Sequence, residues 1–202
     1  MEIKKIKFTW RQPLIPLNLS RVDGIAYHHM AHSSAGIREI ESWHLANDGG
    51  TWRGFGYNYW ISKNGEIYEG RGLNVGAGVA GENGHIISIG FQGDYEKVDR
   101  EMPVLQFNAG VWLTRKLLRE MPSIRTVHGH KYWNKTACPG KYFPLAEMVT
   151  DVYRKEPEHW ADGAYTFLTK EKGITVHEKR FDDAATRGDM FVMLARVLGY
   201  RG

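Results

Sequence analysis

The stretch IRTVHGHKYWNKTACPG, residues 124–140, begins with a short apolar run and contains two histidines and the only cysteine of the chain. IRTVHG (124–129) predicts a buried strand, and the Pro-Gly pair after Cys138 predicts an irregular loop. One cysteine cannot form an internal disulfide, and a lone buried cysteine is usually a small core residue. Polar neighbours suit core packing poorly, so a metal ligand and a core residue are about equally favoured at this position.

The chain has nine histidines, and six of them gather at two places. One group lies in or after the predicted strand IAYHH (25–29), and the other precedes the cysteine: His28, His29, His32 and His44, then His128 and His130. Imidazole and thiolate are ligands that zinc prefers, and three protein ligands leave a fourth position for water. The spacing is therefore compatible with a zinc site built at the ends of two strands.

The surrounding sequence predicts an α/β fold. A second apolar strand is expected at 85–93, and YNYWIS and EIYEG, joined by Lys63-Asn64-Gly65, predict a β-hairpin. One helix is expected after Ser33 and Ser34, which would cap it, and another after Pro103. The buried face of that second helix is predicted from apolar spacing as Val104, Phe107, Val111 and Leu118. Strands mixed with helices and a hairpin indicate a mixed central β-sheet flanked by helices.

Length and composition indicate one main domain with a small appendage. The chain has 202 residues, of which 42% are hydrophobic, which is enough for a substantial core. A charged segment with a proline, RKEPEHW (154–160), separates a Gly- and aromatic-rich region from a tail with helical periodicity. We therefore expect a domain at 1–150, a linker at 151–158 and a small helical module at 159–202.

Charge and hydropathy narrow the classes of partner. The formal net charge of +4 lies in the first 150 residues and favours a modestly charged surface over a nucleic-acid-binding face. No stretch is long and apolar enough for a membrane span, and the first twenty residues lack the pattern of a cleavable signal. We expect no nucleic-acid partner and no membrane insertion, while the oligomeric state stays open.

Five blocks in order resemble the N-acetylmuramoyl-L-alanine amidases related to peptidoglycan recognition proteins and amidase-type phage lysozymes. The resemblance runs from about residue 23 to 148 and rests on IAYHH, IREIESWH, GYNYWISKNGEIYEGRGLNVGAG, SIGFQGDY and HGHKYWNKTACPG. It implies the amidase fold, bacterial peptidoglycan as the partner, and hydrolysis of the amide between N-acetylmuramic acid and the first L-alanine of the stem peptide. The domain at 1–150 is then the catalytic one.

The resemblance also implies a ligand set for one Zn²⁺ per chain. His28 matches the ligand at the end of the first strand, and His130 and Cys138 match the two in the final loop. His29 ranks second as a ligand because it should point to the opposite face of the strand, and His128 ranks third. Zinc bound in this way would lower the pKa of a water molecule and so supply a nucleophile near neutral pH.

Two further residues match catalytic positions of the family. The hydroxyl of Tyr57 can orient water or donate to the oxyanion, and Thr136 can donate a hydrogen bond where some members have lysine. Without the resemblance, a packed Tyr57 would be the more ordinary interpretation.

The substrate contacts are less defined. The positions expected to contact substrate are His29, Trp52, His85 and Trp133, whereas His32 and His44 are expected to be structural or to line the groove wall. Many family members have histidine where this chain has Gly78, so that groove histidine is either missing or replaced by His85.

The tail has a resemblance of its own. EHWADGAYTFLTKEKGI and FDDAATRGDMFVMLARVLGY are similar to one repeat of the S-layer homology type, which in that family holds proteins on cell-wall polymers. These modules usually occur in threes, so a helical cap without binding activity is the alternative. The resemblance implies that 159–202 binds a cell-wall polymer.

Together these features predict a phage endolysin that stays in the host cytoplasm until lysis and then acts on the cell wall. A bacterial autolysin with the same chemistry is one alternative. A recognition module that binds peptidoglycan without cleaving it is the other, although members of that group have typically lost the zinc ligands that this chain retains.

Overall fold

The computed structural model describes residues 1–47 and 52–154. The chain divides after Arg154 into two units, Met1–Arg154 and Lys155–Gly202. The predicted helical module at 159–202, with its wall-binding role, lies outside the described residues and stays a prediction. Among the residues that are described, no helix is both long enough and apolar enough to cross a membrane.

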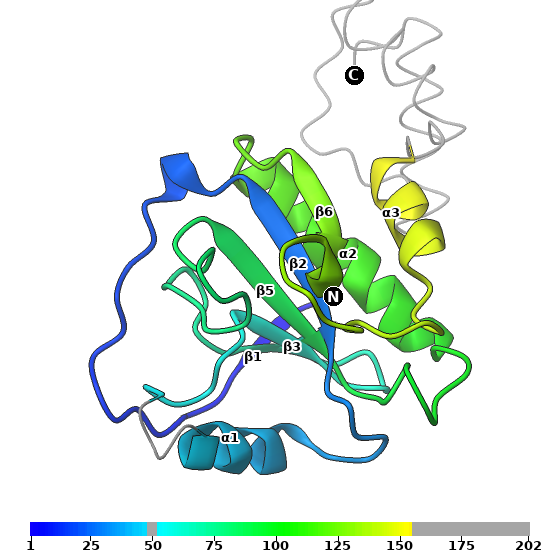
Figure 1. Ribbon diagram of the computed structural model, residues 1–202. Helices are drawn as coiled ribbons and strands as arrows, with labels where there is room; N and C mark the ends of the chain where they lie inside the picture. Colours follow the sequence, from blue (N-terminus) through cyan, green and yellow to red (C-terminus); the bar gives the residue numbers. More distant parts are fainter. Residues whose placement is uncertain (48–51, 155–202) are drawn as a thin grey trace, which may run out of the picture. The chain divides into compact units, whose positions relative to one another are not determined.

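The first unit is built on one six-stranded mixed sheet, and the predicted fold class is confirmed (Figure 1). Its spatial order is β1-β4-β3-β5-β2-β6, and only β3 and β4 pair antiparallel. The strands are β1 (Ile3–Lys5), β2 (Gly24–His29), β3 (Tyr59–Ile61), β4 (Ile67–Glu69), β5 (Ile86–Phe91) and β6 (Thr126–Gly129). The β3–β4 hairpin turns at Gly65, whose φ of +79° suits the predicted Asn-Gly turn.

The strands β2 and β5 form the centre of the sheet, and every residue in both is buried. Such continuous apolar runs are typical of parallel strands that are covered on both faces. The register pairs Gly24 with Ile86 and His28 with Gly90, so both strands run in the same direction toward the histidines. The chain therefore delivers His28 to the carboxyl end of the sheet, where parallel α/β sheets usually bind ligands.

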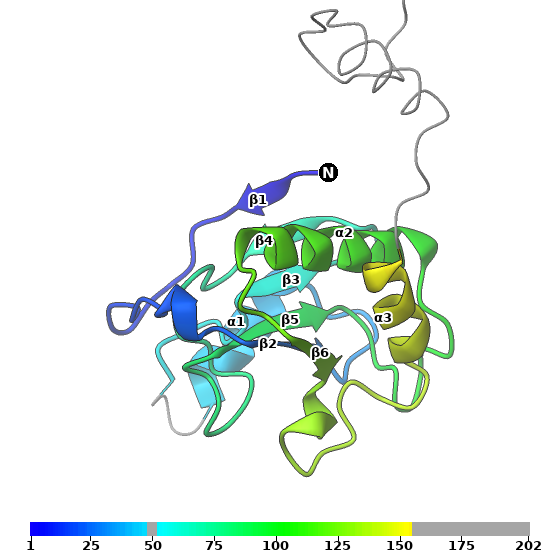
Figure 2. The ribbon, with the colours of Figure 1, turned by 90° about the horizontal axis from the view of Figure 1, so that it is seen from above.

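Helices cover both faces of this sheet (Figures 1 and 2). Helices α2 (Val104–Glu120) and α3 (Leu145–Tyr153) contribute to the larger core with the inner strands. Helix α1 (Ile37–Ala46) contributes to a second core on the other face, with Phe55 and Trp60. The described residues also include the short 3-10 turns η1 (Leu19–Arg21) and η3 (His130–Tyr132). Because α3 continues to Tyr153, the predicted linker at 151–158 begins too early.

The buried face of α2 differs from the predicted one. Val104 is 68% exposed and the other three predicted residues are only partly buried. The buried residues are Gln106, Ala109, Gly110, Leu113, Thr114 and Leu117. Apolar spacing misses this face because two of its residues are polar and satisfied: the Gln106 amide donates to the carbonyls of Ile61 and Gln92, and Thr114 shares a 2.7 Å hydrogen bond with Tyr27.

The start of α1 also differs from the prediction. Its N-cap is Gly36, whose N–H donates to the Glu39 carboxylate at 2.8 Å, and neither Ser33 nor Ser34 caps it. The Ser33 hydroxyl instead donates to Asp99 at 2.9 Å, which ties this loop to the segment after β5.

Candidate metal centre

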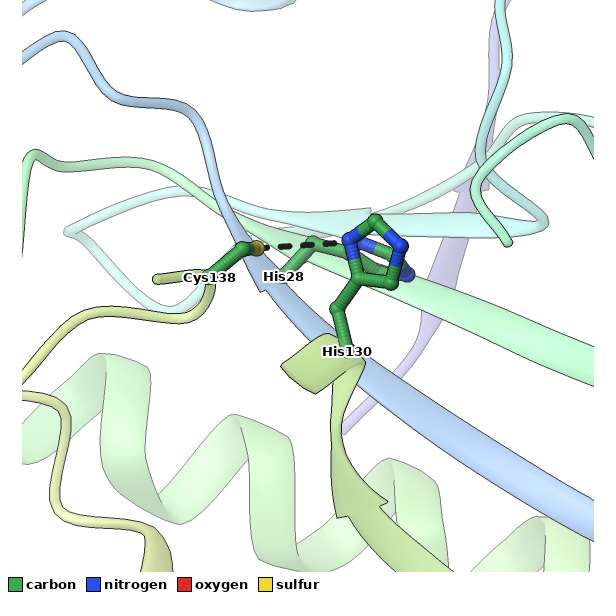
Figure 3. A group of neighbouring side chains, drawn as sticks. All are labelled: His28, His130 and Cys138. Carbon is green, nitrogen blue, oxygen red and sulfur yellow. Dashed lines mark hydrogen bonds between the residues drawn. The ribbon is translucent and has the colours of Figure 1, made fainter. Parts of the chain in front are cut away.

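The structure brings together one cysteine and two histidines that are far apart in the sequence (Figure 3). His28 lies at the end of β2, His130 follows the last residue of β6, and Cys138 lies in the loop after η3. One ligand atom from each residue lies within 4.8 Å of the others. Within residues 1–47 and 52–154, these three side chains form a group that could hold a metal ion.

Backbone geometry explains the convergence. Strands β2 and β6 are parallel neighbours, so their carboxyl ends place His28 and His130 side by side, with ring centroids 4.6 Å apart. The Lys131 N–H donates to the Cys138 carbonyl at 2.9 Å, which closes the loop and returns the cysteine to the histidines. A Cβ at Gly129 would lie 2.4 Å from Pro139, so only glycine allows this close return.

The donor set fits zinc. The Cys138 Sγ and His28 Nδ1 atoms are 3.7 Å apart. With ordinary Zn–S and Zn–N bond lengths, two ligands of one tetrahedral zinc are separated by about 3.6 Å. Two imidazoles and one thiolate also leave one coordination position open, as in catalytic zinc sites. The residues present therefore match the chemistry of such a site, and the distance from Cys138 Sγ to His28 Nδ1 matches its spacing.

Burial sets the charge states of these ligands. His28 is 1% exposed, and burial, followed by the neighbouring His130, holds its pKa well below 6.5, so its ring is neutral. Burial raises the pKa of the Cys138 thiol to about 12, opposed by a hydrogen bond from the His29 backbone. A thiol in this state is not the activated nucleophile of a cysteine hydrolase, whereas a bound divalent cation would deprotonate it.

The two residues that match catalytic positions lie beside this group. The ring centroid of Tyr57 is 5.1 Å from that of His28, and burial, then the neighbouring Cys138, raises the pKa of its hydroxyl. Tyr57 is therefore a permanent hydrogen-bond donor at neutral pH. Thr136 Oγ1 accepts the Cys138 N–H at 3.2 Å, which leaves the hydroxyl proton of Thr136 available to another acceptor.

His29 is held away from the ligand group. Its Nδ1 accepts the Tyr95 N–H at 3.0 Å and lies 3.8 Å from the Asp94 carboxylate. Burial lowers the pKa of this imidazole. Because Nδ1 accepts the Tyr95 N–H, the proton of the neutral ring lies on Nε2. The structure therefore gives His29 the role of anchoring the segment after β5.

The two tryptophans expected at the substrate have different surroundings. Trp52 is half-buried and lines a hollow of about 200 Å³ together with Arg71 and Ala77. Trp133 packs against the sheet with Val79 and Ile86. Trp52 is thus available to a ligand in that hollow, whereas much of the Trp133 ring is used in packing.

His85 lies at the opposite end of the sheet from the ligand group. It directly precedes β5, whose Gly90 pairs with His28, and the five residue steps from His85 to Gly90 span about 16 Å of extended strand. Its ring is held by Asp23 at 2.6 Å and Glu82 at 2.7 Å. His85 therefore lies too far from the ligand group to replace the groove histidine that the family resemblance led us to expect at position 78.

Gly78 itself lies against the ligand group. A Cβ at this position would lie 2.5 Å from Ser88 Oγ and 3.1 Å from His28 Nε2. The backbone of this loop therefore approaches the sheet too closely for any side chain at residue 78 unless the loop or Ser88 shifts.

The two carboxylates around His85 give a prediction for stability against pH. Hydrogen bonds from the His85 ring to the carboxylates of Asp23 and then Glu82 raise the pKa of His85 above 6.5 in the folded protein. The stabilisation that charged His85 provides is complete below about pH 6.5, the pKa of a histidine in the unfolded chain. It is lost as the pH rises through the higher pKa of His85 in the folded protein. We expect the melting temperature of His85→Gln to fall below that of the wild type at about pH 5.5 and to match it at about pH 9. A difference in melting temperature that does not change with pH would contradict the interaction of charged His85 with Asp23 and Glu82.

Two further polar residues lie at the site. His44 accepts the Gly56 N–H on Nδ1 at 3.1 Å, burial lowers its pKa to about 4, and its ring lies 5.3 Å from that of Tyr57. This agrees with the expectation that His44 is structural or lines the site. Asn134 was not expected there, and its oxygen lies 2.9 Å from His130 Nε2. Its sequence signal is the spacing of four residues, one helical turn, from His130.

Comparisons with known proteins agree with this geometry. A family profile described as N-acetylmuramoyl-L-alanine amidase matches residues 18–141. Peptidoglycan-recognition protein SC1a of Drosophila melanogaster is 32% identical over 114 residues, which cover 55% of this chain and 60% of that protein. The chain thus spans less than two thirds of the length of the relatives that it matches in sequence.

Solved structures extend the likeness to the fold. The endolysin N-acetylmuramoyl-L-alanine amidase LysCS from Clostridium intestinale URNW has a TM-score of 0.65 and 28% identity, covering 73% of this chain and 92% of that chain. Peptidoglycan recognition protein-LE, solved with tracheal cytotoxin, a monomeric diaminopimelic acid-type peptidoglycan, has a TM-score of 0.63 and 26% identity, with the same coverage. Since the family profile spans more than half of the chain and includes all three ligand candidates, this protein belongs to the N-acetylmuramoyl-L-alanine amidase family.

Proposed function

We propose that this protein is a zinc-dependent peptidoglycan hydrolase that cleaves the amide between N-acetylmuramic acid and the first L-alanine of the stem peptide. The observation that carries the proposal is the group of two imidazoles and one thiol within 4.8 Å, with Tyr57 beside it. Family membership supports the substrate and the bond, and the similar structure of a Clostridium intestinale endolysin amidase supports hydrolysis.

Each residue has a defined part in this reaction. His28, His130 and Cys138 would hold one Zn²⁺, which when bound lowers the pKa of a water molecule toward neutrality. Burial keeps His28 neutral, so its lone pair is free for a metal. Tyr57 keeps its proton and can donate to the carbonyl oxygen of the substrate as negative charge develops there. Thr136 can supply a second donor from the neighbouring loop.

The competing function is binding without cleavage. Peptidoglycan recognition protein-LE is a structural relative that was solved in complex with a peptidoglycan fragment. The retained thiol favours hydrolysis in this chain, since a recognition module has no need of a metal ligand set with an open position. A bacterial autolysin would share the site and the reaction of a phage endolysin.

The biological role that we propose is that of a phage endolysin, held in the host cytoplasm until lysis and then acting on the cell wall. Its support is the likeness to the endolysin LysCS in both fold and sequence. The binding of a cell-wall polymer by residues 159–202 stays a separate prediction.

The test combines metal content with bond-specific cleavage. We expect one zinc per purified chain, and release of new N-terminal alanine from a peptidoglycan suspension that stops on chelation and returns with zinc. Chelator-insensitive cleavage would contradict the metal mechanism. Zinc and peptidoglycan binding without alanine release would establish the recognition module instead.

A further inference from the structure

We infer that Asn134 is a positioning residue that fixes the ring of His130 for metal binding, an inference that rests on the proposed function. The Asn134 Oδ1 atom lies 2.9 Å from His130 Nε2. Imidazoles that bind metals commonly donate their second N–H to an outer acceptor, which fixes both the tautomer and the ring orientation. His130 follows β6 directly and is only half-buried, so packing alone constrains its ring less than that of His28.

The hydrogen bonds of the amide decide which of its atoms faces the imidazole. The Asn134 Nδ2 atom donates to the carbonyl of Ala80 at 3.2 Å and to the carbonyl of Trp133 at 3.1 Å. A carbonyl oxygen can only accept, so the NH₂ group must face these two carbonyls and Oδ1 must face His130. The imidazole therefore carries its proton on Nε2. Its Nδ1, with a free lone pair, is the nitrogen left for a metal.

The backbone of the same turn sets this arrangement. The Asn134 N–H donates to the His130 carbonyl at 3.2 Å, and the Trp133 N–H donates to the same carbonyl at 3.0 Å. Residues four apart on such a turn lie on the same side, so the two side chains meet without any long-range adjustment. The sequence HKYWN thus encodes a metal ligand together with its own outer partner.

Asn134 also ties this turn to the loop of residues 76–85. The loop presents the Ala80 carbonyl to Asn134, and it is braced internally because Asn83 Oδ1 accepts the Val79 N–H at 2.9 Å. Asn134 therefore joins the turn of His130 to a segment about 50 residues away in the sequence. Asn83 is therefore a suitable control residue, since it supports the loop but forms no hydrogen bond with His130.

His28 shows why the hydrogen bond matters at one ligand and not at the other. Its Nε2 is buried and has no hydrogen-bond partner among the described residues. The ring is instead enclosed by the sheet and by the backbone at Gly78, as its 1% exposure shows. We therefore assign orientation by packing to His28 and orientation by hydrogen bonding to His130.

The test measures metal affinity rather than hydrolysis alone. We expect Asn134→Ala to weaken zinc binding about 10–100-fold in a chelator competition and to alter the visible spectrum of the Co²⁺-loaded protein. Asn134→Asp keeps an oxygen acceptor for His130 and should recover most of the affinity. Asn83→Ala, the matched control, should leave the affinity unchanged. Equal melting temperatures of the wild type and Asn134→Ala under chelation would show that the fold is intact.

The outcomes separate this inference from the proposed function. Zinc binding by Asn134→Ala that equals the wild type would overturn the positioning role and leave the hydrolase standing. Equal weakening in Asn134→Ala and Asn83→Ala would also overturn it, because the effect would then come from loop support. A wild-type chain that binds no zinc would remove the metal site itself, and the inference with it.

Discussion

Replacement of Cys138 by serine is expected to remove zinc from the protein and to abolish amide hydrolysis. The thiol is the only sulfur ligand of the candidate site, with Sγ 3.7 Å from His28 Nδ1. A serine hydroxyl does not ionise near neutral pH and is a poor zinc ligand, so two imidazoles would be left to hold the ion. The loss of affinity should exceed the ~10–100-fold that removal of an outer partner causes. Zinc content and alanine release from peptidoglycan measure the two effects.

The neighbouring residue provides the control for this variant. Ala137 is exposed in the same loop, and its carbonyl accepts the Gly140 N–H, so Ala137→Ser adds a hydroxyl without removing a ligand. We expect Ala137→Ser to keep zinc and activity. The melting temperature of Cys138→Ser should equal that of the chelated wild type. Full activity in Cys138→Ser would refute the ligand assignment and would indicate that Cys138 is only a packing residue of the loop.

Replacement of Tyr57 by phenylalanine is expected to lower kcat about 10²–10³-fold, the loss typical of one missing oxyanion donor. The variant keeps the ring that lies 5.1 Å from His28 and removes only the hydroxyl. Zinc content should stay at that of the wild type because the hydroxyl is not needed as a ligand. The same peptidoglycan assay, run alongside metal analysis, measures both quantities.

Tyr59 offers the same chemical change outside the site. Its ring belongs to the core between the sheet and α2, whereas Tyr57 packs with the smaller cluster on the other face. Tyr59→Phe should therefore leave kcat close to that of the wild type. If Tyr57→Phe lost zinc together with activity, Tyr57 would be a structural support of the metal site rather than a donor to the substrate.

The sequence by itself was sufficient for much of the fold. Apolar runs predicted β2 and β5 because strands buried on both faces need continuous apolar residues. The shorter run IRTVHG predicted β6, but this strand lies at the edge of the sheet and is only partly buried. The Asn-Gly turn predicted the β3–β4 hairpin, since few residues adopt its positive φ. Residue chemistry and family likeness also selected His28, His130 and Cys138, which the structure brings within ligand distance of one another. Their role as zinc ligands stays a prediction.

Only the tertiary structure decided which polar groups meet. Glu82 is a local neighbour of His85, but nothing local indicates that Asp23, 62 residues away, holds the other ring nitrogen at the far end of the sheet. Apolar periodicity could not find the buried Gln106, because the carbonyls that satisfy its amide come from β3 and from the residue after β5. In the same way, the Ala80 carbonyl fixes the amide of Asn134 from another loop. Periodicity is a property of neighbours along the chain, whereas a buried hydrogen bond depends on a partner that packing alone brings near.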